Sequence, residues 1–357
     1  MTVWSRYRVA PTSPGREATS KLSEQGAPLA SVIVLGYNGK AYIDDCLTSL
    51  AAQDMPDSDY EVLFVDNGSQ DGSASYVRER FPGVRLIELD RNFGYAEGNN
   101  IGFRYTRGKY VVFLNQDTIV HRRWLRGLVE GLDASPSIKA GHSNIIQSWY
   151  PEFQARELER PLEVLYTGDL CRLGYIRYRK LAYTDKPLDL LFLQGVALMI
   201  KRDVVDELGY IFDPDFFAYA EDLDLGLRIR ALGYRTVLVP TSVVYHKHHL
   251  KTRLTVQNFL FTVRIVRNRC LSLFKCMYLA EFLVALPLTI LGAPLNATQF
   301  GLRPAQRVLY FLYLVPVSLA ALLTLPFHLP RYARKRSEVL ARRVPDRFWF
   351  LREMLKR

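Results

Sequence analysis

The sequence has few cysteines, and none of them falls in a pattern typical of metal binding. Its 357 residues contain Cys46, Cys171, Cys270 and Cys276, with neither a CxxC pair nor the spacing of a zinc site. A disulfide-stapled secreted scaffold is therefore excluded, and a reducing cytosolic compartment is the simplest interpretation. The N-terminal segment is polar and lacks the apolar core of a signal peptide, so we interpret residues 1–29 as a mobile leader.

Most of the chain carries little net charge, although the net charge of the whole sequence is +11. Residues 331–357 hold ten Lys and Arg and three acids, a net +7, so residues 1–330 together carry only +4. This nearly balanced body argues against nucleic acid as a partner. The basic tail directly follows an apolar stretch, which indicates a membrane surface instead. No protein partner can be inferred from these patterns.

Short apolar runs alternate with helical patterns in the first third of the chain. We predict strands at 31–35, 61–65, 84–88 and 110–114, with helices between them at 40–53, up to about 81, and at 95–106. This alternation predicts a mainly parallel sheet covered on both faces, with ligands at the carboxyl ends of its strands. Residues 147–190 are less regular and suit an insertion or acceptor-facing region. Order returns with a helix at 222–232 and a strand at 236–239.

Two acids stand where predicted strands end. Asp66 follows the strand at 61–65, and Asp117 follows the strand at 110–114. An acid at one strand end can accept hydrogen bonds from a nucleobase or ribose, and an acid at a second can hold a divalent cation between phosphate oxygens. Either acid alone could simply form a turn or a cap. Two of them on neighbouring strand ends favour a ligand site.

Several segments, in order along the chain, resemble the family 2 glycosyltransferases with the GT-A fold, and most of all their rhamnosyltransferase-type members. The segments are 31–38 (SVIVLGYN), 66–73 (DNGSQDGS), 92–100 (NFGYAEGNN), 114–118 (LNQDT), 192–202 (FLQGVALMIKR) and 212–225 (FDPDFFAYAEDLDL). Together they cover about residues 30–270. The resemblance implies an α/β GT-A nucleotide-diphospho-sugar transferase fold. It also implies inverting transfer of a sugar from a nucleotide-diphosphate donor to a hydroxyl of a glycan or lipid-linked acceptor.

The same resemblance implies a set of donor-binding residues at the strand ends. They are Tyr37, Asn38, Asp66, Asn67, Asn92, Gly94, Asn99, Asn115 and Gln116. Three of them surround a strand-to-helix junction, where glycine permits close backbone approach and the helix N-terminus favours an anion. Ordinary capping is an equally good interpretation of each of those three. The resemblance to rhamnosyltransferases indicates dTDP-L-rhamnose as a donor, and a bacterial cell-surface glycan or its lipid-linked precursor as the product.

A leaving diphosphate needs charge neutralisation, which Mn²⁺ or Mg²⁺ usually supplies. Asp117 matches the final acid of the family's DxD motif, whereas Asn115 replaces the first acid, so we expect modest metal affinity. His246 matches the family's histidine after the last core strand and is the expected second ligand. Its imidazole suits Mn²⁺ better than Mg²⁺. The neighbouring His248 and His249 fit a solvated turn.

Two acids open the predicted helix at 222–232, directly after the aromatic run 216–219. Acids favour a helix N-terminus for structural reasons alone. An aromatic run, however, would wall a cleft and lower its dielectric. The acids match the family's Glu-Asp motif, which implies Asp222 as the catalytic base and Glu221 as the second candidate. Adjacent acids can push one pKa upward, which suits a base that works near neutrality.

Four further residues are assigned to the acceptor side. Asp224 and Arg228 are expected to support the site, or to bind the acceptor or the diphosphate, and Gln194 and Gly195 resemble the segment that borders the acceptor. Two other functions stay open. A polyprenyl-phosphate glycosyltransferase would use the lipid phosphate itself as acceptor. A non-catalytic scaffold on a decayed GT-A fold is supported by Asn115, but five intact residues argue against it: Asp66, Asp117, Glu221, Asp222 and His246.

Two apolar blocks follow a predicted amphipathic basic helix at 259–276. The block at 308–329 has no charged residue and is long enough to span about 30 Å of hydrocarbon, whereas the block at 277–295 is shorter and contains an acid and two prolines. The flanks are more basic than the linker, so the positive-inside rule keeps both on the cytoplasmic face. The prolines also permit an interfacial pair that never crosses, and a buried helical pair is the alternative.

These patterns divide the chain into four parts. We expect the mobile leader at 1–29, the GT-A domain at 30–270, an apolar membrane-associated hairpin at 271–330 and a basic cytoplasmic tail at 331–357. The expected location is the cytoplasmic face of a bacterial inner or plasma membrane.

Overall fold

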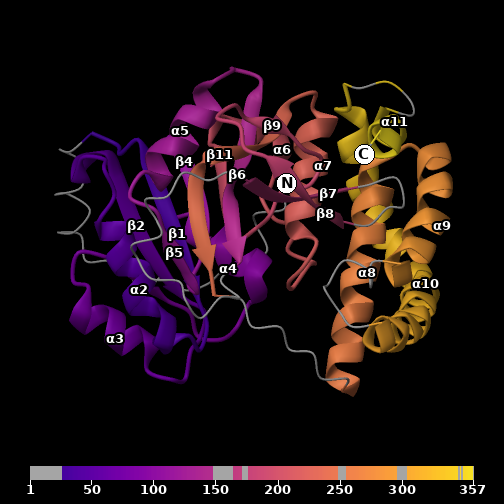
Figure 1. The fold of residues 1–357 in the computed structure, drawn as a ribbon, viewed down its shortest axis with the longest axis horizontal. Helices are drawn as coiled ribbons and strands as arrows, with labels where there is room; N and C mark the ends of the chain where they lie inside the picture. Colours follow the sequence, from indigo (N-terminus) through magenta and orange to yellow (C-terminus); the bar gives the residue numbers. More distant parts are fainter. Residues whose placement is uncertain are drawn as a thin grey trace.

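The computed structural model describes residues 26–147, 164–170, 176–247, 255–295, 304–344, 346 and 349–356. The predicted leader therefore lies almost wholly outside the described residues, as do Cys171, His248 and His249. Within these ranges a mixed β-sheet with helices on both faces forms one part of the molecule, and long C-terminal helices form the other (Figure 1).

The first four strands of the sheet are parallel, as predicted. In spatial order they are β3 (Arg85–Glu88), β2 (Tyr60–Asp66), β1 (Ala30–Gly36) and β4 (Tyr110–Asn115). The sheet then continues through β10 (Ala197–Lys201), β6 (Ile138–Gln147), β11 (Arg235–His246) and β5 (Thr118–Val120), with β9 (Leu188–Asp189) beside β11. Strand β10 is antiparallel to both neighbours, and β11 is parallel to β6 but antiparallel to β5. The predicted parallel arrangement therefore holds for β3, β2, β1 and β4 and for the β6–β11 pair, whereas β10, β5 and β9 run antiparallel to their neighbours. A buried apolar strand has the same pattern in either direction, so the sequence did not distinguish them.

Alternating side chains of the central strands build a separate core on each face. Val32 and Val34 of β1 pack with α2 (Lys40–Ala51), α3 (Ser73–Arg80) and α5 (Trp124–Asp133). Ile33, which points the other way, packs with α4 (Gly94–Phe103), α6 (Asp203–Leu208) and α7 (Glu221–Ala231). The sheet is thus covered on both faces, and the carboxyl ends of its parallel strands stay open between the two layers.

The C-terminal helices continue the second layer outward. They are α8 (Val256–Cys276), α9 (Leu279–Leu295), α10 (Pro304–Ala341) and α11 (Trp349–Lys356), and α8 packs directly on α7. Figure 1 shows them in orange and yellow on the right of the molecule. The domain boundaries expected at residues 270 and 330 fall inside the continuous helices α8 and α10.

Several strand segments are not predicted by the sequence patterns. The region 147–190, predicted to be irregular, contains the hairpin of β7 (Val164–Leu170) and β8 (Ile176–Ala182). Strand β6 was also missed, and β11 continues to His246, well past the predicted 236–239. The polar residues of β6 hid it from the pattern. Ser143, for example, is buried because it finds a tertiary partner: the Trp124 indole donates to its hydroxyl at 2.8 Å.

Candidate active site

The predicted donor residues gather at one edge of the sheet. Gly36 of β1 lies opposite Asp66 of β2, and Leu35 lies opposite Asn115 of β4, so three neighbouring strands end together. Because the strands are parallel, the loops that follow them meet at this edge. The register thus brings together segments that lie far apart in the sequence.

Asp117 and His246 form a pair suited to a metal ion. Strand β5 beside β11 brings them together, and the Lys247 backbone N–H donates to the Asp117 carbonyl at 2.8 Å. Asp117 Oδ1 lies 3.3 Å from His246 Nε2, with the imidazole buried and the carboxylate partly exposed. One oxygen and one nitrogen at this separation can share a divalent cation, and this donor set suits Mn²⁺. No cluster of three or more His, Cys, Asp or Glu occurs among the described residues, so a diphosphate and water would supply the remaining ligands.

Asp66 is a buried carboxylate with one oxygen left over. Its Oδ2 accepts a hydrogen bond from the Ser69 backbone N–H at 3.0 Å, while Oδ1 has no partner among the described residues. The side chain is 3% exposed. A buried acceptor without a partner is costly, so Oδ1 is suited to receive an N–H or O–H from a ligand.

The asparagines next to Asp66 hold loops together. Asn67 Nδ2 donates to the Asn92 side-chain oxygen and to the Gly94 carbonyl, both at 3.1 Å, and Asn67 Oδ1 accepts from the Phe93 N–H. Gly94 has φ +80°, and a Cβ there would lie 2.2 Å from the Phe217 carbonyl oxygen. These contacts favour the capping interpretation of Asn67 and Asn92, and they explain the glycine.

Other predicted donor residues also bond to backbone. Gln116 makes two hydrogen bonds with the backbone of Tyr37, accepting at 3.2 Å and donating at 3.0 Å, which leaves the Tyr37 ring exposed. Asn38 accepts from the Gln70 N–H at 2.8 Å and joins the first two loops. Asn99 is buried and donates to the Tyr95 carbonyl. Their amides shape the edge, whereas the Tyr37 ring stays available to a ligand.

Asp222 stands at the start of α7, across the same edge. Its Oδ2 accepts from the Gly195 N–H at 3.0 Å and its Oδ1 from the Leu223 N–H at 2.8 Å. Burial nevertheless raises the pKa of Asp222 to about 6, with these N–H groups and Arg269 acting in the opposite direction. Burial and the neighbouring Asp222 charge raise the pKa of Glu221 well above its ordinary value. A carboxyl group with this pKa could accept a proton near neutrality, so the geometry is compatible with the base role that the family resemblance implies for Asp222.

Tyr219 is a site residue that the sequence patterns did not single out. Partial burial raises its pKa although the residue is 48% exposed, and the charges of Glu221, Asp117 and Asp222 raise it further. Tyr219 and Ala220 both have positive φ, 71° and 68°, a conformation that L-residues rarely adopt. The aromatic run indicated a cleft wall, and the fold places the exposed Tyr219 ring directly before the acids that open α7.

Asp224 and Arg228 belong to a buried ion cluster, defined here as Asp213, Asp224, Arg228, Lys275 and Lys335. Asp224 lies 2.7 Å from the Arg228 guanidinium and 2.6 Å from the Lys275 ammonium. Lys275 and Lys335 both contact Asp213, at 2.6 and 2.5 Å. All of these side chains except that of Lys335 are nearly inaccessible to solvent. This geometry favours the supporting role expected for Asp224 and Arg228 over binding of the acceptor or the diphosphate.

Gln194 and Gly195 lie where β10 begins, next to the base. Besides the Gly195 bond to Asp222, the Gly195 carbonyl accepts from the Tyr95 hydroxyl at 2.5 Å. The Gln194 amide nitrogen lies 3.4 Å from Nε2 of the buried His142, whose pKa burial lowers to about 3. These hydrogen bonds fix the turn, and the turn contacts Asp222 from the side of the sheet.

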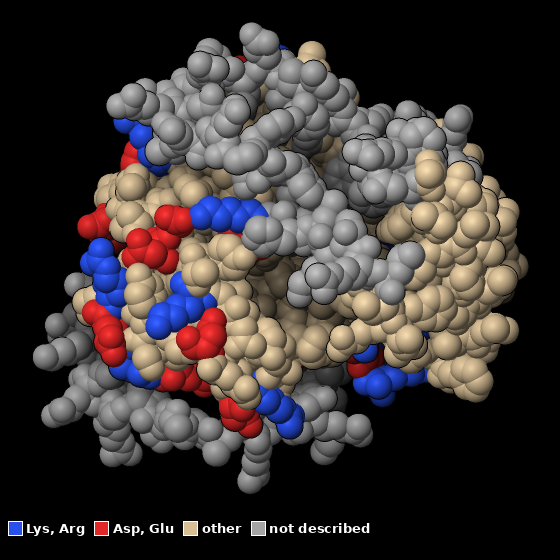
Figure 2. Space-filling view, turned by 60° about the horizontal axis from the view of Figure 1, so that its bottom comes forward, with Lys and Arg blue, Asp and Glu red and all other residues tan. Residues whose placement is uncertain are grey.

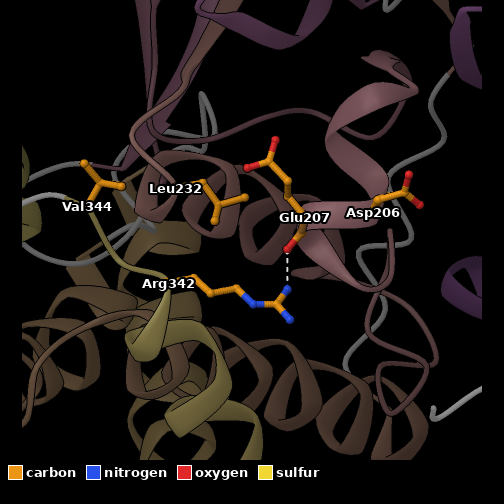
Figure 3. A pocket seen from close by; sticks show the side chains of 5 residues that line it. All are labelled: Asp206, Glu207, Leu232, Arg342 and Val344. Atoms are coloured by element: carbon orange, nitrogen blue, oxygen red, sulfur yellow. Dashed lines mark hydrogen bonds between the residues drawn. The ribbon is translucent and has the colours of Figure 1, made fainter. Parts of the chain in front are cut away.

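A cavity of about 460 Å³ lies elsewhere, at the seam between the sheet domain and the C-terminal helices (Figure 3). Its walls contain none of the predicted site residues; they are Asp206, Glu207, Leu232, Arg342 and Val344. The Arg342 guanidinium donates to the Glu207 carbonyl across this seam at 2.5 Å. The cavity is separate from the sheet edge where the chemistry gathers.

Comparison with known proteins identifies the family. The family described as Glycosyl transferase family 2 matches residues 31–209, just over half of the chain. The chain therefore belongs to glycosyl transferase family 2. A crystal structure of GalNAc-T7 with UDP, GalNAc and Mn²⁺ superposes with a TM-score of 0.58 and 15% identity, covering 86% of this chain and 58% of that one. This likeness confirms the GT-A fold predicted from the motifs.

Two relatives with different names are similar to this chain over part of their length. Glycosyltransferase AglE of Haloferax volcanii is 36% identical over 185 residues, which is 51% of this chain and 55% of AglE. The match thus spans little more than half of that relative. The N-acetylglucosaminyl-diphospho-decaprenol L-rhamnosyltransferase of Mycobacterium tuberculosis is 27% identical over 244 residues, which is 61% of this chain and 76% of that protein.

Proposed function

We propose that this protein is an inverting glycosyltransferase that moves a sugar from a nucleotide-diphosphate donor to a hydroxyl of a glycan or lipid-linked glycan. One observation carries the proposal: the Asn115 N–H, two residues before Asp117, donates to the Val196 carbonyl at 2.9 Å, and the adjacent Gly195 N–H donates to Asp222 at 3.0 Å. The loop that carries the metal-binding pair and the turn that holds the proposed base therefore meet at the same edge of the sheet. A transferase needs this arrangement, because the leaving diphosphate and the attacking hydroxyl meet at one anomeric carbon.

The donor half of the site has a role for each of its acids. Asp66 would accept a hydrogen bond from the nucleoside through its unpartnered Oδ1. Asp117 and His246 would hold Mn²⁺ or Mg²⁺, which supplies positive charge to the leaving diphosphate. With only one carboxylate at the metal pair, we expect weaker metal binding than a site with two would give.

The acceptor half follows from Asp222. As the acceptor oxygen attacks the anomeric carbon, its proton passes to the Asp222 carboxylate and the nucleoside diphosphate leaves from the opposite face. The two N–H donors from Gly195 and Leu223 fix the orientation of the carboxylate. Burial and the neighbouring Asp222 charge raise the pKa of Glu221 well above its ordinary value, which disfavours its ionised form beside the proposed base.

We also propose dTDP-L-rhamnose as the donor, on the basis of the rhamnosyltransferase-like motifs. A mycobacterial relative that is named as a rhamnosyltransferase supports this choice. The decisive experiment is a hydrolysis screen of the purified chain with a panel of nucleotide sugars, with and without Mn²⁺. We expect one donor to be hydrolysed well above the rest, in a metal-dependent way. Absence of hydrolysis and transfer with every donor, under conditions where the protein is folded, would contradict the proposal.

The C-terminal helices supply the proposed link to a membrane. Val308–Ala341 of α10 is long and apolar enough to cross one, yet only 28% of its most apolar stretch is buried. Large apolar side chains of α9 and α10 are exposed; they are Leu279, Leu283, Val284, Leu291, Val308, Leu309, Phe311, Leu312, Val315, Leu319, Leu322, Leu323 and Phe327. Figure 2 shows a broad surface almost without charge on this side. So large an exposed apolar surface is typical of contact with lipid rather than water.

We place this surface on the cytoplasmic face of the membrane, because the residues flanking it are basic. Helix α9 has 17 residues, about 25 Å of helix, which is short for a span. A quadruple variant, with Leu312, Leu319, Leu323 and Phe327 each replaced by Gln, tests the proposal in the full chain. We expect it to leave the membrane fraction under carbonate extraction that retains the parent. Parent protein that stays soluble without detergent would contradict the membrane proposal and leave the transferase proposal intact.

A further inference from the structure

Helix α8 lies outside the part of the chain that matches the family, yet it reaches the candidate active site. Asn268 Nδ2 donates to the Tyr219 carbonyl at 3.2 Å, and the Phe261 ring meets the Tyr219 ring edge-on at 4.7 Å. Phe261, Arg264 and Asn268 are spaced i, i+3 and i+7, so they share one face of the helix. That face forms a wall beside the loop that leads into the base.

The same face carries positive charge. The Arg264 guanidinium lies over the Phe217 ring at 5.6 Å and is exposed, and among the described residues no carboxylate pairs with it. By contrast, Lys275 on the same helix is held between two aspartates of the buried ion cluster. An exposed arginine that stacks on an aromatic ring beside a catalytic acid is well placed to bind an anion.

An apolar surface continues from this arginine toward the proposed membrane face. Leu260 and Val256, the next residues toward the start of α8, are exposed. The hydroxyls of Thr262 and Tyr313 lie 3.1 Å apart, so this part of α8 runs beside the apolar N-terminal half of α10. The Phe261 ring, the Arg264 guanidinium over Phe217, and exposed apolar side chains therefore lie together on the part of α8 that packs beside the Tyr219 loop.

We propose that α8 forms an acceptor subsite for a sugar linked to a lipid through phosphate or diphosphate. Arg264 binds the phosphate, while Phe217 and Phe261 contact the first part of the lipid chain. The inference rests on the proposed transferase function, and it assigns the acceptor to the lipid-linked class. An ordinary water-soluble glycan would use neither the charge nor the apolar face.

Farnesyl diphosphate is a suitable probe, since it combines a diphosphate with a short lipid chain. Its binding is measured by calorimetry on the full chain in neutral detergent with EDTA, so that the metal-dependent nucleotide site contributes little. We expect farnesol and inorganic pyrophosphate each to bind at least tenfold more weakly than farnesyl diphosphate. If pyrophosphate binds as tightly as farnesyl diphosphate, a subsite that contacts the lipid chain is ruled out.

The Arg264→Gln variant is the main test, with Arg334→Gln as its control. Arg334 is an exposed arginine of α10 that contacts Glu338 at 3.2 Å, so the control makes the same charge change away from the site. We expect Arg264→Gln to weaken farnesyl diphosphate binding at least tenfold and the control to stay within twofold of the parent. Equal binding by both variants would overturn the proposal.

A second variant tests the apolar part. Phe261→Ala should weaken farnesyl diphosphate several-fold and leave pyrophosphate binding unchanged, because it removes only a ring that is already 39% exposed. Thermal unfolding of all three variants should match the parent, which separates loss of the subsite from loss of the fold. Equal weakening of farnesyl diphosphate and pyrophosphate would contradict a role in contacting lipid.

Two further measurements separate this inference from its rivals. Flotation with vesicles of phosphatidylglycerol or phosphatidylcholine should be the same for Arg264→Gln and the parent. The variant could instead lose only its preference for the anionic vesicles and bind farnesyl diphosphate normally. In that case Arg264 binds anionic lipid headgroups of the membrane, and the proposal is wrong. Donor hydrolysis should persist in Arg264→Gln. Absence of hydrolysis in the parent, with intact binding of the probe, would contradict the transferase function but not the subsite.

Discussion

Two aspartates on the first turn of α7, Asp222 and Asp224, differ in the groups that contact their carboxylates. Asp224 is buried between Arg228 and Lys275, with ion-pair distances of 2.7 and 2.6 Å. Asp222, two residues earlier, is held by two backbone N–H groups, and burial raises its pKa to about 6. Two cations therefore form close ion pairs with Asp224, whereas Asp222 feels a cation, Arg269, only as a minor influence and keeps a raised pKa.

The ion cluster around Asp224 also joins three helices. Burial opposes ionisation of Asp213, but the ammonium groups of Lys275 and Lys335 more than offset it and hold the pKa of Asp213 well below its ordinary value. Asp224 is on α7, Lys275 on α8 and Lys335 on α10. The C-terminal helices are therefore part of the unit that positions the base. A chain ending near residue 270 would lose both lysines and leave buried carboxylates without partners.

The largest expected effect comes from neutralising Asp222, the acid that is held by backbone N–H groups. Asp222→Asn should lower the rate of transfer by about 10²–10⁴-fold, because general-base catalysis is worth that much, and should leave nucleotide affinity nearly unchanged. Single-turnover transfer assays and nucleotide titration measure the two quantities. Asp57→Asn, on the exposed surface, is the control. A variant that turns over at nearly the parental rate would exclude Asp222 as the base.

The second-largest expected effect comes from removing Lys275, the cation between Asp213 and Asp224. Lys275→Met should lower the free energy of unfolding by about 3–5 kcal/mol, because it leaves Asp213 and Asp224 buried with fewer cations. Denaturant unfolding in detergent measures the loss, and Arg334→Gln should change stability by less than about 0.5 kcal/mol. Should Lys275→Met unfold at the parental denaturant concentration, the cluster has no stabilising role.

Two further variants distinguish Asp117, which we assign to the metal ion, from Asp66, which we assign to the nucleoside. Asp117→Ala should weaken nucleotide binding about 10–100-fold in Mn²⁺ and very little in EDTA, because it removes a charged ligand to the ion. Asp66→Ala should weaken binding about tenfold in both conditions, since its assigned contact is with the nucleoside. If Asp117→Ala binds nucleotide normally in Mn²⁺, the metal assignment is wrong.

The pH profile tests the same comparison without mutation. Asp222 acts as a base only when ionised, so transfer at subsaturating acceptor should rise with pH through about 6 and then level off. Most of the change, up to about tenfold per unit below the pKa, should lie between pH 4.5 and 6.5. A profile that is already flat at pH 5 would show that the pKa of the base is not raised.

The smallest effect concerns stability. Since the folded-state pKa of Asp222 is raised, the folded protein binds this proton more tightly than the unfolded chain, and ionised Asp222 destabilises the fold above about pH 6. Asp222→Asn should therefore stabilise the protein at pH 7.5 by about 1–2 kcal/mol, after a discount for the partial exposure of the side chain, and by almost nothing below pH 4. An equal effect at both values would indicate that the gain does not come from charge.

Local patterns predicted much of the N-terminal half. Apolar runs and strand-end acids placed β1, β2 and β4 and their ligand edge, because parallel strands alternate with helices in a regular way. The motif at 221–222 predicts the base, which stays a prediction, whereas the family match and the fold confirm the class of protein. The direction of β10 and the existence of β6 were not predictable, because polar residues such as Ser143 become strand residues only once a distant side chain satisfies them.

The sequence by itself determined that this is a family 2 glycosyltransferase chain with an apolar, basic C-terminal part, since motif order, hydropathy and charge are properties of the linear chain. Only the tertiary structure decided which acids are neutralised, because Lys275 reaches Asp213 and Asp224 from a different helix, far along the sequence. It also decided that Asn268 and Phe261 of α8 contact Tyr219, at the end of the loop that leads into α7. Ion pairs and cleft walls depend on distances in space, and those distances are set only when α8 packs on α7.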